Sequence, residues 1–373
     1  MNKKMFKKIT IIFCLFFSLQ AHSKQEIITI TDDVYLLKST FEDLYNWENE
    51  DYKEALKIFL DSCKKIKSLP KDKNLFPQIN SKINKNDFYA VCKIANIIKN
   101  YNHKYLQVFF ESYFIPYRIV DIKHNSLFTG YYLPQINAKR TKDDIFKYPI
   151  YRKAEDFENN GKYYTRQEIN DGILNDRNLE ILYTDDLVEL FFFHIQGSGS
   201  VYLVDENKII FIGYDGKNDY NFTSIGKYML NNALIDEEKI NAKDIKTELK
   251  KNMELAKFVM NKNESYIFFK ILEDNVVTGS FGTQLIPFRT IAVDTRYIPL
   301  GFPLWLNTRH TQKDRIEEFS KLVIANDTGS AIKGGIRGDI FFGSGIDGEN
   351  NASYQHSEGE YFLLIPTRVV RKL

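Results

Sequence analysis

Three aspartates near the C-terminal end of the chain stand where β-type runs meet glycine or threonine. They are Asp294 in Ile291-Ala-Val-Asp-Thr-Arg, Asp327 in Val323-Ile-Ala-Asn-Asp-Thr-Gly, and Asp339 in Gly338-Asp-Ile-Phe-Phe-Gly. Strand ends can bring carboxylates from distant segments together, and such carboxylates suit general acid–base chemistry. The pattern predicts an acid–base site. The structural alternative is a glycine-rich hairpin whose aspartates cap turns.

The connection between Asp327 and Asp339 is dense in glycine and contains Lys333, which we count as a candidate ligand contact. Glycine lets the backbone turn tightly and lets a bulky ligand approach closely. A phosphate-cradling loop is the rival interpretation. However, the spacing departs from the P-loop pattern, and carboxylates at both ends would repel phosphate.

Two further segments combine aromatic rings with polar groups, at 127–134 (Leu-Phe-Thr-Gly-Tyr-Tyr-Leu-Pro) and 191–199 (Phe-Phe-Phe-His-Ile-Gln-Gly-Ser-Gly). Tyrosines can stack on sugar rings and bond to their hydroxyls, and amide and hydroxyl groups suit a neutral polar ligand. The candidate contacts are Thr129, Gly130, Tyr131, Gln196, Gly197 and Ser198. The structural alternative is a pair of strand–turn segments with core aromatics, in which His194 sits mid-strand.

Other chemistries find little support. Among the six histidines none forms an i, i+4 pair with a partner carboxylate, so we expect no metal site and no cofactor. Ser198 lacks the Gly-x-Ser-x-Gly frame of a nucleophile elbow. The net charge of +2 falls to 2 − 4 = −2 once the four lysines of the N-terminal segment are removed, and lysine and arginine are not clustered. Nucleic acid is therefore not an expected partner.

The N-terminus has the form of a signal peptide, which we place at residues 1–23. Lysines precede an apolar run over Ile9–Leu19, and small residues lead to Ser23. The apolar run is short for an uncleaved membrane anchor. Lipidation at Cys14 is disfavoured because bulky Phe13 precedes it. Export predicts an oxidising compartment, where Cys63 and Cys92 form either a disulfide or two buried thiols.

Hydrophobic periodicity predicts helices first and strands afterwards. The helical patterns cover 52–66, 88–98 behind the caps Asn86 and Asp87, and 106–113, which Pro116 would end. β-type composition dominates from about 126 to 220, followed by a helix opening at Thr223 or Ser224 and another over about 244–261. The predicted later strands are Ile267–Ile271, Thr290–Val293, Leu304–Leu306, Leu322–Ala325, Ile340–Phe342 and Tyr361–Ile365. Many short strands with glycine turns favour a barrel.

Six of these segments occur in an order that resembles the membrane-bound lytic murein transglycosylase A family, over roughly residues 105–370. They are Phe-Thr-Gly-Tyr-Tyr, His-Ile-Gln-Gly-Ser-Gly, Gly213–Asn218, Tyr220–Gly226, Asn263–Phe269 and the three-aspartate segment. Two features depart from the family pattern. Leu133 replaces a residue that is usually polar, and the connection from Asp327 to Asp339 is one residue longer.

The resemblance implies a mainly β fold with α, in which a double-psi β-barrel carries an inserted smaller β-rich domain and a cleft lies between them. The barrel domain, with the N-terminal helices, would comprise 24–134 and 263–373, and the insert 135–262. By resemblance Asp339 is the catalytic acid/base, with Asp327 and Thr129 lining the site around it. Gln196 and its Gly-Ser neighbours would contact glycan. Asp294 either contacts substrate or, as we favour, anchors a strand end.

The resemblance also implies an exported enzyme of the periplasm, associated with the outer membrane, that acts on peptidoglycan glycan strands. We expect a monomer, with other cell-wall enzymes as candidate partners. Such an enzyme breaks the bond between N-acetylmuramic acid and N-acetylglucosamine without water. Two alternatives stay open: a hydrolytic glycosidase that uses Asp327 or Asp294 as base, and a non-catalytic wall-binding module of expansin type.

Overall fold

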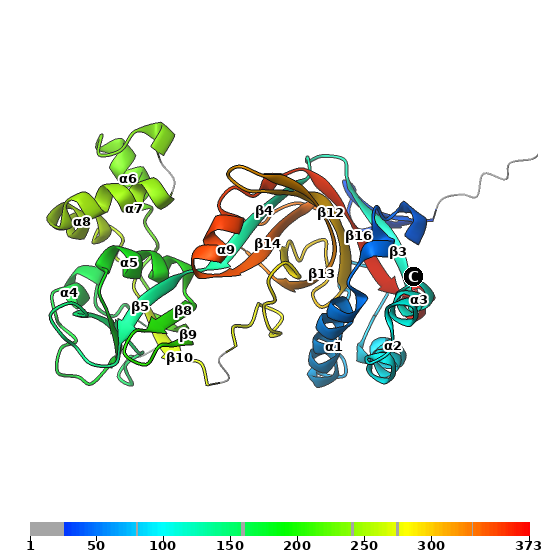
Figure 1. Cartoon of the computed structure of the whole chain (residues 1–373), viewed down its shortest axis with the longest axis horizontal. Coiled ribbons are helices and arrows are strands. Elements are labelled where there is room, and N and C mark those ends of the chain that lie inside the picture. The colour runs from blue at the N-terminus through cyan, green and yellow to red at the C-terminus, as the bar shows by residue number, and fades with distance from the viewer. Residues whose placement is uncertain (1–25, 80, 158–160, 240–241, 274–275, 330) are drawn as a thin grey trace, which may run out of the picture.

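Two β-sheets organise the chain, and helices flank each of them (Figure 1). The computed structural model describes residues 26–79, 81–157, 161–239, 242–273, 276–329 and 331–373. The predicted signal peptide, residues 1–23, lies outside the described residues. Within the described ranges, no helix has the length and apolar character needed to span a bilayer.

The larger sheet has ten strands in the order β1-β2-β3-β16-β12-β13-β11-β14-β4-β15. Their bounds are β1 Ile27–Thr29, β2 Val34–Lys38, β3 Phe114–Asp121, β4 Leu127–Leu133, β11 Thr290–Val293, β12 Pro303–Thr311, β13 Ile316–Asp327, β14 Arg337–Ser344, β15 His356–Ser357 and β16 Gly359–Pro366. The sheet curls until β15 returns to β12, where the Thr311 and Ser357 hydroxyls share a hydrogen bond of 2.9 Å. The last six strands in the series from β12 to β15 form the predicted, nearly closed barrel, with β11 parallel to β13 and β14 parallel to β4.

The smaller sheet belongs to the insert, at the left of Figure 1, and has the order β10-β9-β8-β5-β7-β6. Its strands are β5 Gln135–Lys139, β6 Tyr148–Tyr151, β7 Glu180–Thr184, β8 Gly199–Leu203, β9 Lys208–Lys217 and β10 Ile267–Ile271. The expected boundary at residue 262 assigned β10 to the barrel. Instead β10 pairs antiparallel with β9, from Ile267 opposite Lys217 to Ile271 opposite Ile212. The strand pattern itself shows no partner, which is why the sequence placed this strand in the wrong sheet.

The helices of the insert are α4 Arg166–Asn170, α5 Leu187–Gln196, α6 Ile225–Asn231, α7 Ala242–Lys251 and α8 Met253–Met260. The interpretation of 191–199 as a strand–turn segment is wrong, because α5 covers most of it. The Asp186 side chain caps α5 by accepting from the backbone N–H groups of Val188 and Glu189, and Gly197 ends the helix at φ 76°. The single helix predicted over 244–261 is divided, because Asn252 caps a new helix.

Three helices precede the barrel: α1 Tyr52–Ser68, α2 Lys85–Ile98 and α3 His103–Tyr113. Two short helices, α9 Gly345–Ala352 and α10 Thr367–Val370, follow its strands. The cap of α2 is Asn84, and Asp87 completes a capping box instead of starting the helix. Helix α3 passes directly into β3, so Pro116 lies in a strand. A disulfide joins Cys63 of α1 to Cys92 of α2, with their Cα atoms 5.6 Å apart, which decides between the two alternatives for these cysteines.

The N-terminal helices share one hydrophobic core with the barrel. Trp47 packs edge-on against Trp305 of β12, with ring centroids 5.0 Å apart. Buried Arg289, immediately before β11, donates to Glu50 at 2.6 Å and to Glu54 of α1 at 2.7 Å. The helices therefore support the strands that carry the aspartates.

Candidate active site

A row of residues crosses four neighbouring strands of the barrel. Ala292 on β11 lies opposite Asp327 of β13 on one side and opposite Asp339 of β14 on the other, and Asp339 in turn lies opposite Thr129 of β4. Residues paired in this way project from the same face of a sheet. The two aspartates are separated by two strand spacings, or about 10 Å between Cα atoms.

Asp339 is held by a chain of donors. The Thr129 hydroxyl donates to its Oδ1 at 2.6 Å, and the Arg337 guanidinium donates to the Thr129 oxygen at 2.8 Å. Within the described residues Oδ2 of Asp339 has no hydrogen-bond partner. Burial raises the pKa of Asp339, and the charge of Asp327 adds to the rise, whereas the Thr129 hydrogen bond and the Arg337 charge oppose it. The Asp339 carboxyl group is therefore fixed in orientation, and one of its oxygens accepts no hydrogen bond from the described residues. Its raised pKa means that it binds a proton more tightly than an ordinary aspartate does.

Asp327 is fully engaged by donors. Its Oδ1 accepts from the backbone N–H and hydroxyl of Ser280 at 2.9 and 2.8 Å and from the N–H of Thr328 at 2.9 Å. Its Oδ2 accepts from the Tyr131 hydroxyl at 2.9 Å. Burial and then the charge of Asp327 raise the pKa of Tyr131 well above its usual value, so the phenol stays a donor. Asp327 therefore fastens β13 to β4 and to the segment returning from the insert.

The row faces the insert. Phe341, two residues after Asp339, forms a small buried cluster with Leu133 and Leu285, and Tyr131 packs against that cluster. Phe211 of β9 joins it from the insert. Because Phe341 and Tyr131 share the face of Asp339, this face of the barrel wall lies beside the smaller domain, as the predicted inter-domain site requires.

Asp294 directly follows β11 and anchors a loop. Its carboxylate is 3% exposed, pairs with Arg296 at 2.5 Å and accepts from the N–H of Gly334 at 3.0 Å. Burial acts to raise the pKa of Asp294, but the hydrogen bonds from Arg296 and Gly334 outweigh it, and the pKa is lowered. This arrangement fits the strand-end anchor that the sequence favoured and leaves no oxygen for a ligand.

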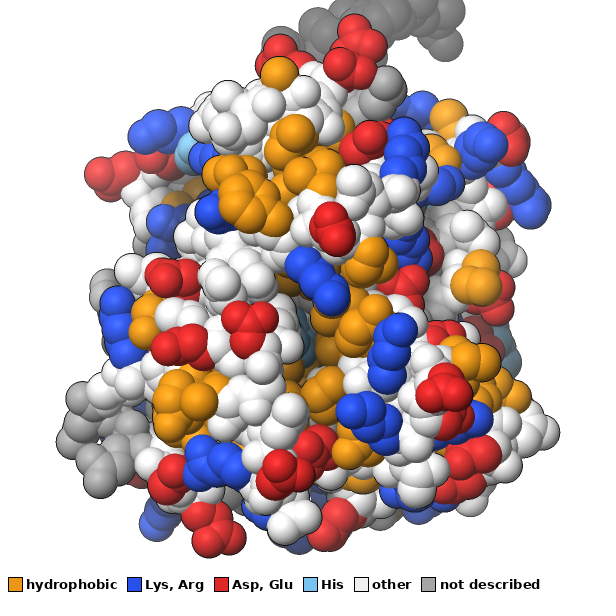
Figure 2. Space-filling view, turned by 90° about the vertical axis from the view of Figure 1, so that its left-hand side faces the viewer, with side chains coloured by type: hydrophobic (Ala, Val, Ile, Leu, Met, Phe, Trp, Pro, Cys, Tyr) orange, Lys and Arg blue, Asp and Glu red, His pale blue; other side chains and the backbone are white. Residues whose placement is uncertain are grey.

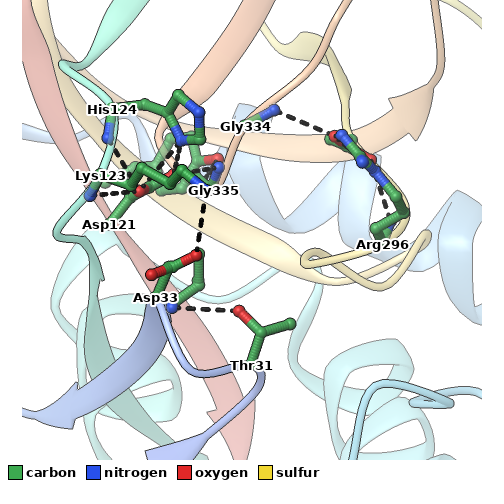
Figure 3. A network of polar contacts seen from close by, with 11 residues as sticks. Thr31, Asp33, Asp121, Lys123, His124, Arg296, Gly334 and Gly335 are labelled. Carbon is green, nitrogen blue, oxygen red and sulfur yellow. Dashed lines mark hydrogen bonds and ion pairs between the residues drawn. The ribbon is translucent and has the colours of Figure 1, made fainter.

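Asp121, at the end of β3, holds the next residue of the same loop. It accepts from the N–H of Gly335 at 2.9 Å and from the N–H groups of Lys123 and His124, both at 3.0 Å. Figure 3 shows Gly334 and Gly335 held from two sides by these contacts. The glycine-dense connection is thus clamped by two carboxylates, and Lys333 beside it is exposed.

Gly130 packs closely against Phe342 and α9. A Cβ at this position would lie 2.6 Å from the Phe342 ring and 2.9 Å from Cα of Ala352. The side of β4 that carries Gly130 faces α9, opposite to the side that carries Thr129 and Tyr131. This packing is a structural reason for glycine at position 130, and its contact with substrate stays a prediction.

Gln196, Gly197 and Ser198 lie on the insert, at the end of α5 and before β8. Gln196 is exposed, and no hydrogen bond within the described chain links these residues to the aspartate row. Hollow space between the domains occurs on the other side of β4: a cavity of about 260 Å³ is lined by Tyr132, Glu189 of α5 and Glu349 of α9. Among the described residues, no group of three or more His, Cys, Asp or Glu side chains could hold a metal ion.

Comparison with known proteins agrees with this architecture. The family model described as the MltA specific insert domain matches residues 127–270, and that of the 3D domain matches 289–364. The membrane-bound lytic murein transglycosylase A homolog of Buchnera aphidicola is 32% identical over 249 residues, or 66% of this chain and 68% of that protein. The chain belongs to the membrane-bound lytic murein transglycosylase A family.

Two further members of the lytic murein transglycosylase A family extend the match. The Vibrio cholerae membrane-bound lytic murein transglycosylase A is 34% identical over 217 residues, which span 57% of this chain but only 58% of that protein. The crystal structure of MltA from Neisseria gonorrhoeae superposes with a TM-score of 0.78 at 27% identity, covering 92% of this chain and 95% of that one. The insert model ends at residue 270, close to the end of β10.

The sequence analysis of this lytic murein transglycosylase A family member missed three residues. Arg337 and Ser280 donate to groups at the two aspartates, and Asp121 holds the loop before β14. Arg337 stands two residues before Asp339 in a strand, so alternation along the strand could have placed it on the same face. Asp121 ends an apolar strand pattern before a polar turn, as Asp294 and Asp327 do. Ser280 has no such signal, because its contact with Asp327 depends on the path of an irregular segment.

Proposed function

We propose that this protein is a lytic murein transglycosylase that cleaves the β-1,4 bond between N-acetylmuramic acid and N-acetylglucosamine of peptidoglycan. The products would carry 1,6-anhydromuramoyl ends. The observation that carries the proposal is the state of Asp339: one oxygen is fixed by Thr129, the other accepts no hydrogen bond from the described residues, and the pKa is raised. The relatives, which are named for this activity, support the substrate class.

In the first step Asp339 acts as a general acid. Its proton passes from the carboxyl group to the glycosidic oxygen, the bond from that oxygen to C1 of the muramoyl residue breaks, and an oxocarbenium-like centre develops. A raised pKa keeps more of the carboxyl protonated at a given pH than in an ordinary aspartate, as a general acid requires. Thr129, backed by Arg337, keeps the carboxyl oriented while its charge changes.

In the second step the Asp339 carboxylate acts as a base. It takes the proton of the muramoyl C6 hydroxyl, and O6 of that residue bonds to C1 of the same ring. Because the nucleophile is tethered to the reacting sugar, this step is effectively unimolecular. Water is neither consumed nor released, and Asp339 ends in its starting protonation state. The sequence of steps needs no metal or cofactor.

A hydrolytic glycosidase would need a second carboxylate free to activate water. Asp327 is the nearest in the strand row, but both of its oxygens accept hydrogen bonds from Tyr131, Ser280 and Thr328. Asp294 is occupied by Arg296 and the clamped loop. We assign Asp327 a positioning role beside the catalytic Asp339.

The test is the substitution Asp339→Asn. It should lower release of soluble muropeptides from purified sacculi by about a thousandfold or more, since general acid–base groups contribute about 10²–10⁴-fold and this residue serves twice. Folding and glycan binding should persist. Asp314→Asn is the matched control, because Asp314 lies exposed in the turn between β12 and β13.

Mass spectrometry of the products separates the candidate activities. Anhydro products lack one water relative to hydrolytic products, so hydrolytic masses would contradict the lyase assignment. Glycan binding with no release by the unsubstituted protein would indicate a non-catalytic wall-binding module. Retained activity of the Asp339→Asn protein would remove Asp339 from the mechanism.

The location and partners form part of the same proposal. We infer an exported protein that works in the periplasm in association with the outer membrane, supported by relatives that are named membrane-bound. Its partner would be the glycan strand, bound by a monomer, with other cell-wall enzymes as further partners. Fractionation of cells with antibody detection tests the location.

A further inference from the structure

The insert contains a hollow at its outer end, remote from the aspartate row. The volume is about 530 Å³, and the walls come from strands β6 and β7, the turn after α4, and helices α5 and α8. Figure 2 shows this end of the molecule, with hydrophobic side chains exposed in a central depression and lysine or arginine side chains around it. The volume lies within the range of about 300–1,000 Å³ that is usual for small-ligand sites.

Four of the lining residues are tyrosines whose hydroxyls have no hydrogen-bond partner among the described residues. Tyr148, Tyr151, Tyr183 and Tyr266 all contribute to its wall. Within the described part of the chain, none of their hydroxyls makes a hydrogen bond, although Tyr151 is 1% and Tyr266 2% exposed. Buried tyrosine hydroxyls usually find a partner. These hydroxyls are therefore available to a ligand or to water in the hollow.

The tyrosines converge and are fixed in place. Strand pairing sets Pro149 opposite Tyr183, and the register shifts between Ile150 and Tyr151. Tyr151 and Tyr183 nevertheless line the same hollow, each held in a strand at the edge of the sheet. Burial, followed by the nearby Glu180 and Tyr183, raises the pKa of Tyr151 to about 12, so its hydroxyl keeps its proton.

A buried guanidinium supports the wall from behind. Arg166 lies 5.1 Å from the centre of the Tyr266 ring and is itself fixed by hydrogen bonds to the carbonyl groups of Asn263 and Ser265. The Tyr266 ring therefore belongs to a rigid part of the insert, and the hollow is formed before any ligand enters.

The lining indicates a neutral ligand rich in hydroxyl and amide groups. Charges balance, with Lys142, Lys147 and Lys257 against Asp171, Asp176 and Glu180. Amide groups come from Asn170, Asn175 and Asn261. Aromatic rings with polar tips, together with amides, match the apolar faces, hydroxyls and acetamido group of an N-acetylated sugar.

We propose that this hollow is a secondary saccharide site, which binds an N-acetylhexosamine unit of a glycan strand away from the bond that is cut. The identity of the polymer rests on the proposed function, but the site uses none of the residues around Asp339. Such a site would keep the enzyme on the wall between cleavage events.

The experiment uses the full exported chain carrying Asp339→Asn, so that no substrate is consumed, with 3-fluorotyrosine in place of tyrosine. Chitotetraose is titrated, and the ¹⁹F resonances are assigned with Tyr151→Phe, Tyr183→Phe and Tyr214→Phe. The Tyr151 and Tyr183 resonances should move saturably, and that of Tyr214, which is 52% exposed on β9, should not. Tyr183→Phe should weaken this binding about 3- to 10-fold, the value of one hydrogen bond.

Three outcomes overturn the proposal. If the Tyr151 and Tyr183 resonances do not shift when chitotetraose is added, the hollow holds only water. Movement with the isolated tetrapeptide stem of peptidoglycan but not with chitotetraose would assign it to peptide. Unchanged affinity in Tyr183→Phe would place the sugar elsewhere. Anhydro-muropeptide release by the protein without Asp339→Asn is measured in parallel, so failure of this site and failure of the proposed function are told apart.

Discussion

At the scale of single residues, the acidity of Asp339 is set by opposing influences. Burial raises its pKa most strongly, while the Thr129 hydrogen bond and then the Arg337 charge lower it. A carboxyl that was only buried would hold its proton too firmly to donate it, and one that was only paired with a cation would lose its proton. In the proposed mechanism, the two neighbours therefore adjust the proton affinity of an acid that gives up a proton and then recovers it.

Replacing Arg337 with Gln should move the pH profile in a defined direction. The arginine charge lowers the pKa of Asp339, so its removal raises that pKa and preserves the protonated acid at higher pH. The alkaline limb of kcat/KM against pH should therefore shift upward, with a lower maximum because Thr129 loses its donor. Arg337→Lys should restore part of the limb position. A downward shift in Arg337→Gln would contradict this account.

The adjacent tyrosines Tyr131 and Tyr132 offer a matched pair. Tyr131 donates to Asp327, whereas Tyr132, on the opposite face of β4, donates to Glu349 at 3.0 Å. Tyr131→Phe should lower kcat about 5-fold, because Asp327 loses a donor worth about 1 kcal/mol. Tyr132→Phe should change kcat less than twofold. Equal effects of the two changes in a steady-state assay would show that only general destabilisation is measured.

The chemical types at the site could be predicted from sequence, but not all of their roles. Asp339 and Thr129 stand in segments whose glycine and strand context marks them, and the structure brings them into contact. Asp294 stands in the same kind of context yet is buried against Arg296. Strand patterns show that a side chain ends a strand. Whether it meets a cation or open space depends on the segment packed against it.

At the scale of elements, two carboxylates from different strands hold one loop. Asp121 of β3 and Asp294 after β11 bond to the consecutive N–H groups of Gly335 and Gly334 (Figure 3). This loop leads directly into β14, which carries Asp339. The clamp thus fixes where β14 begins.

The clamp should make stability depend on pH in the acid range. Hydrogen bonds outweigh burial and lower the pKa of both Asp121 and Asp294 below the ordinary 3.8. Their stabilisation is therefore complete above that value and is lost as the pH falls through the lowered, folded-state pKa values. Asp121→Asn with Asp294→Asn should lower the Tm at pH 7 and flatten its fall below about pH 4. A parallel acid profile in the double variant, measured by calorimetry, would rule out this clamp as the source.

Elements with local signals were predictable, and those fixed by distant contacts were not. The bounds of β10 and β11 follow from runs of β-branched and aromatic residues. Three consecutive phenylalanines favoured a strand at 191–193, but the Asp186 cap and the apolar contacts of α5 prevailed. The parallel pairing of β14 with β4 joins segments about 200 residues apart, which no local pattern can specify.

At the scale of the whole molecule, the N-terminal helices pack against the barrel and stabilise it. Glu50 is 1% exposed in its side chain, bonds to Arg289 and accepts from the N–H of Leu322 at 2.7 Å. Burial raises the pKa of Glu50, and the Arg289 charge opposes that rise. Glu50 therefore links the segment before α1 to β13 and, through Arg289, to the start of β11.

Arg289→Met should therefore destabilise the whole chain. It leaves Glu50 buried without its cation, a change that costs about 3–5 kcal/mol in comparable sites. Urea unfolding should show one transition at lower urea for the helices and barrel together. Arg315→Met, which removes an exposed pair with Glu317, is the control and should cost under about 1 kcal/mol. Separate unfolding of the helices in Arg289→Met would contradict a shared core.

The disulfide between α1 and α2 makes the stability of this framework depend on the compartment that the chain occupies. Such a bond forms where thiols are oxidised and stays open in a reducing cytoplasm. If the protein is exported as proposed, the two helices lack this covalent bond until export, and α1 is also the helix whose Glu54 accepts a hydrogen bond from Arg289 beside β11. The helices that support the aspartate-bearing strands would then become fully rigid only after the chain has left the cytoplasm. The enzyme would thus reach its most stable form in the compartment that contains its proposed substrate.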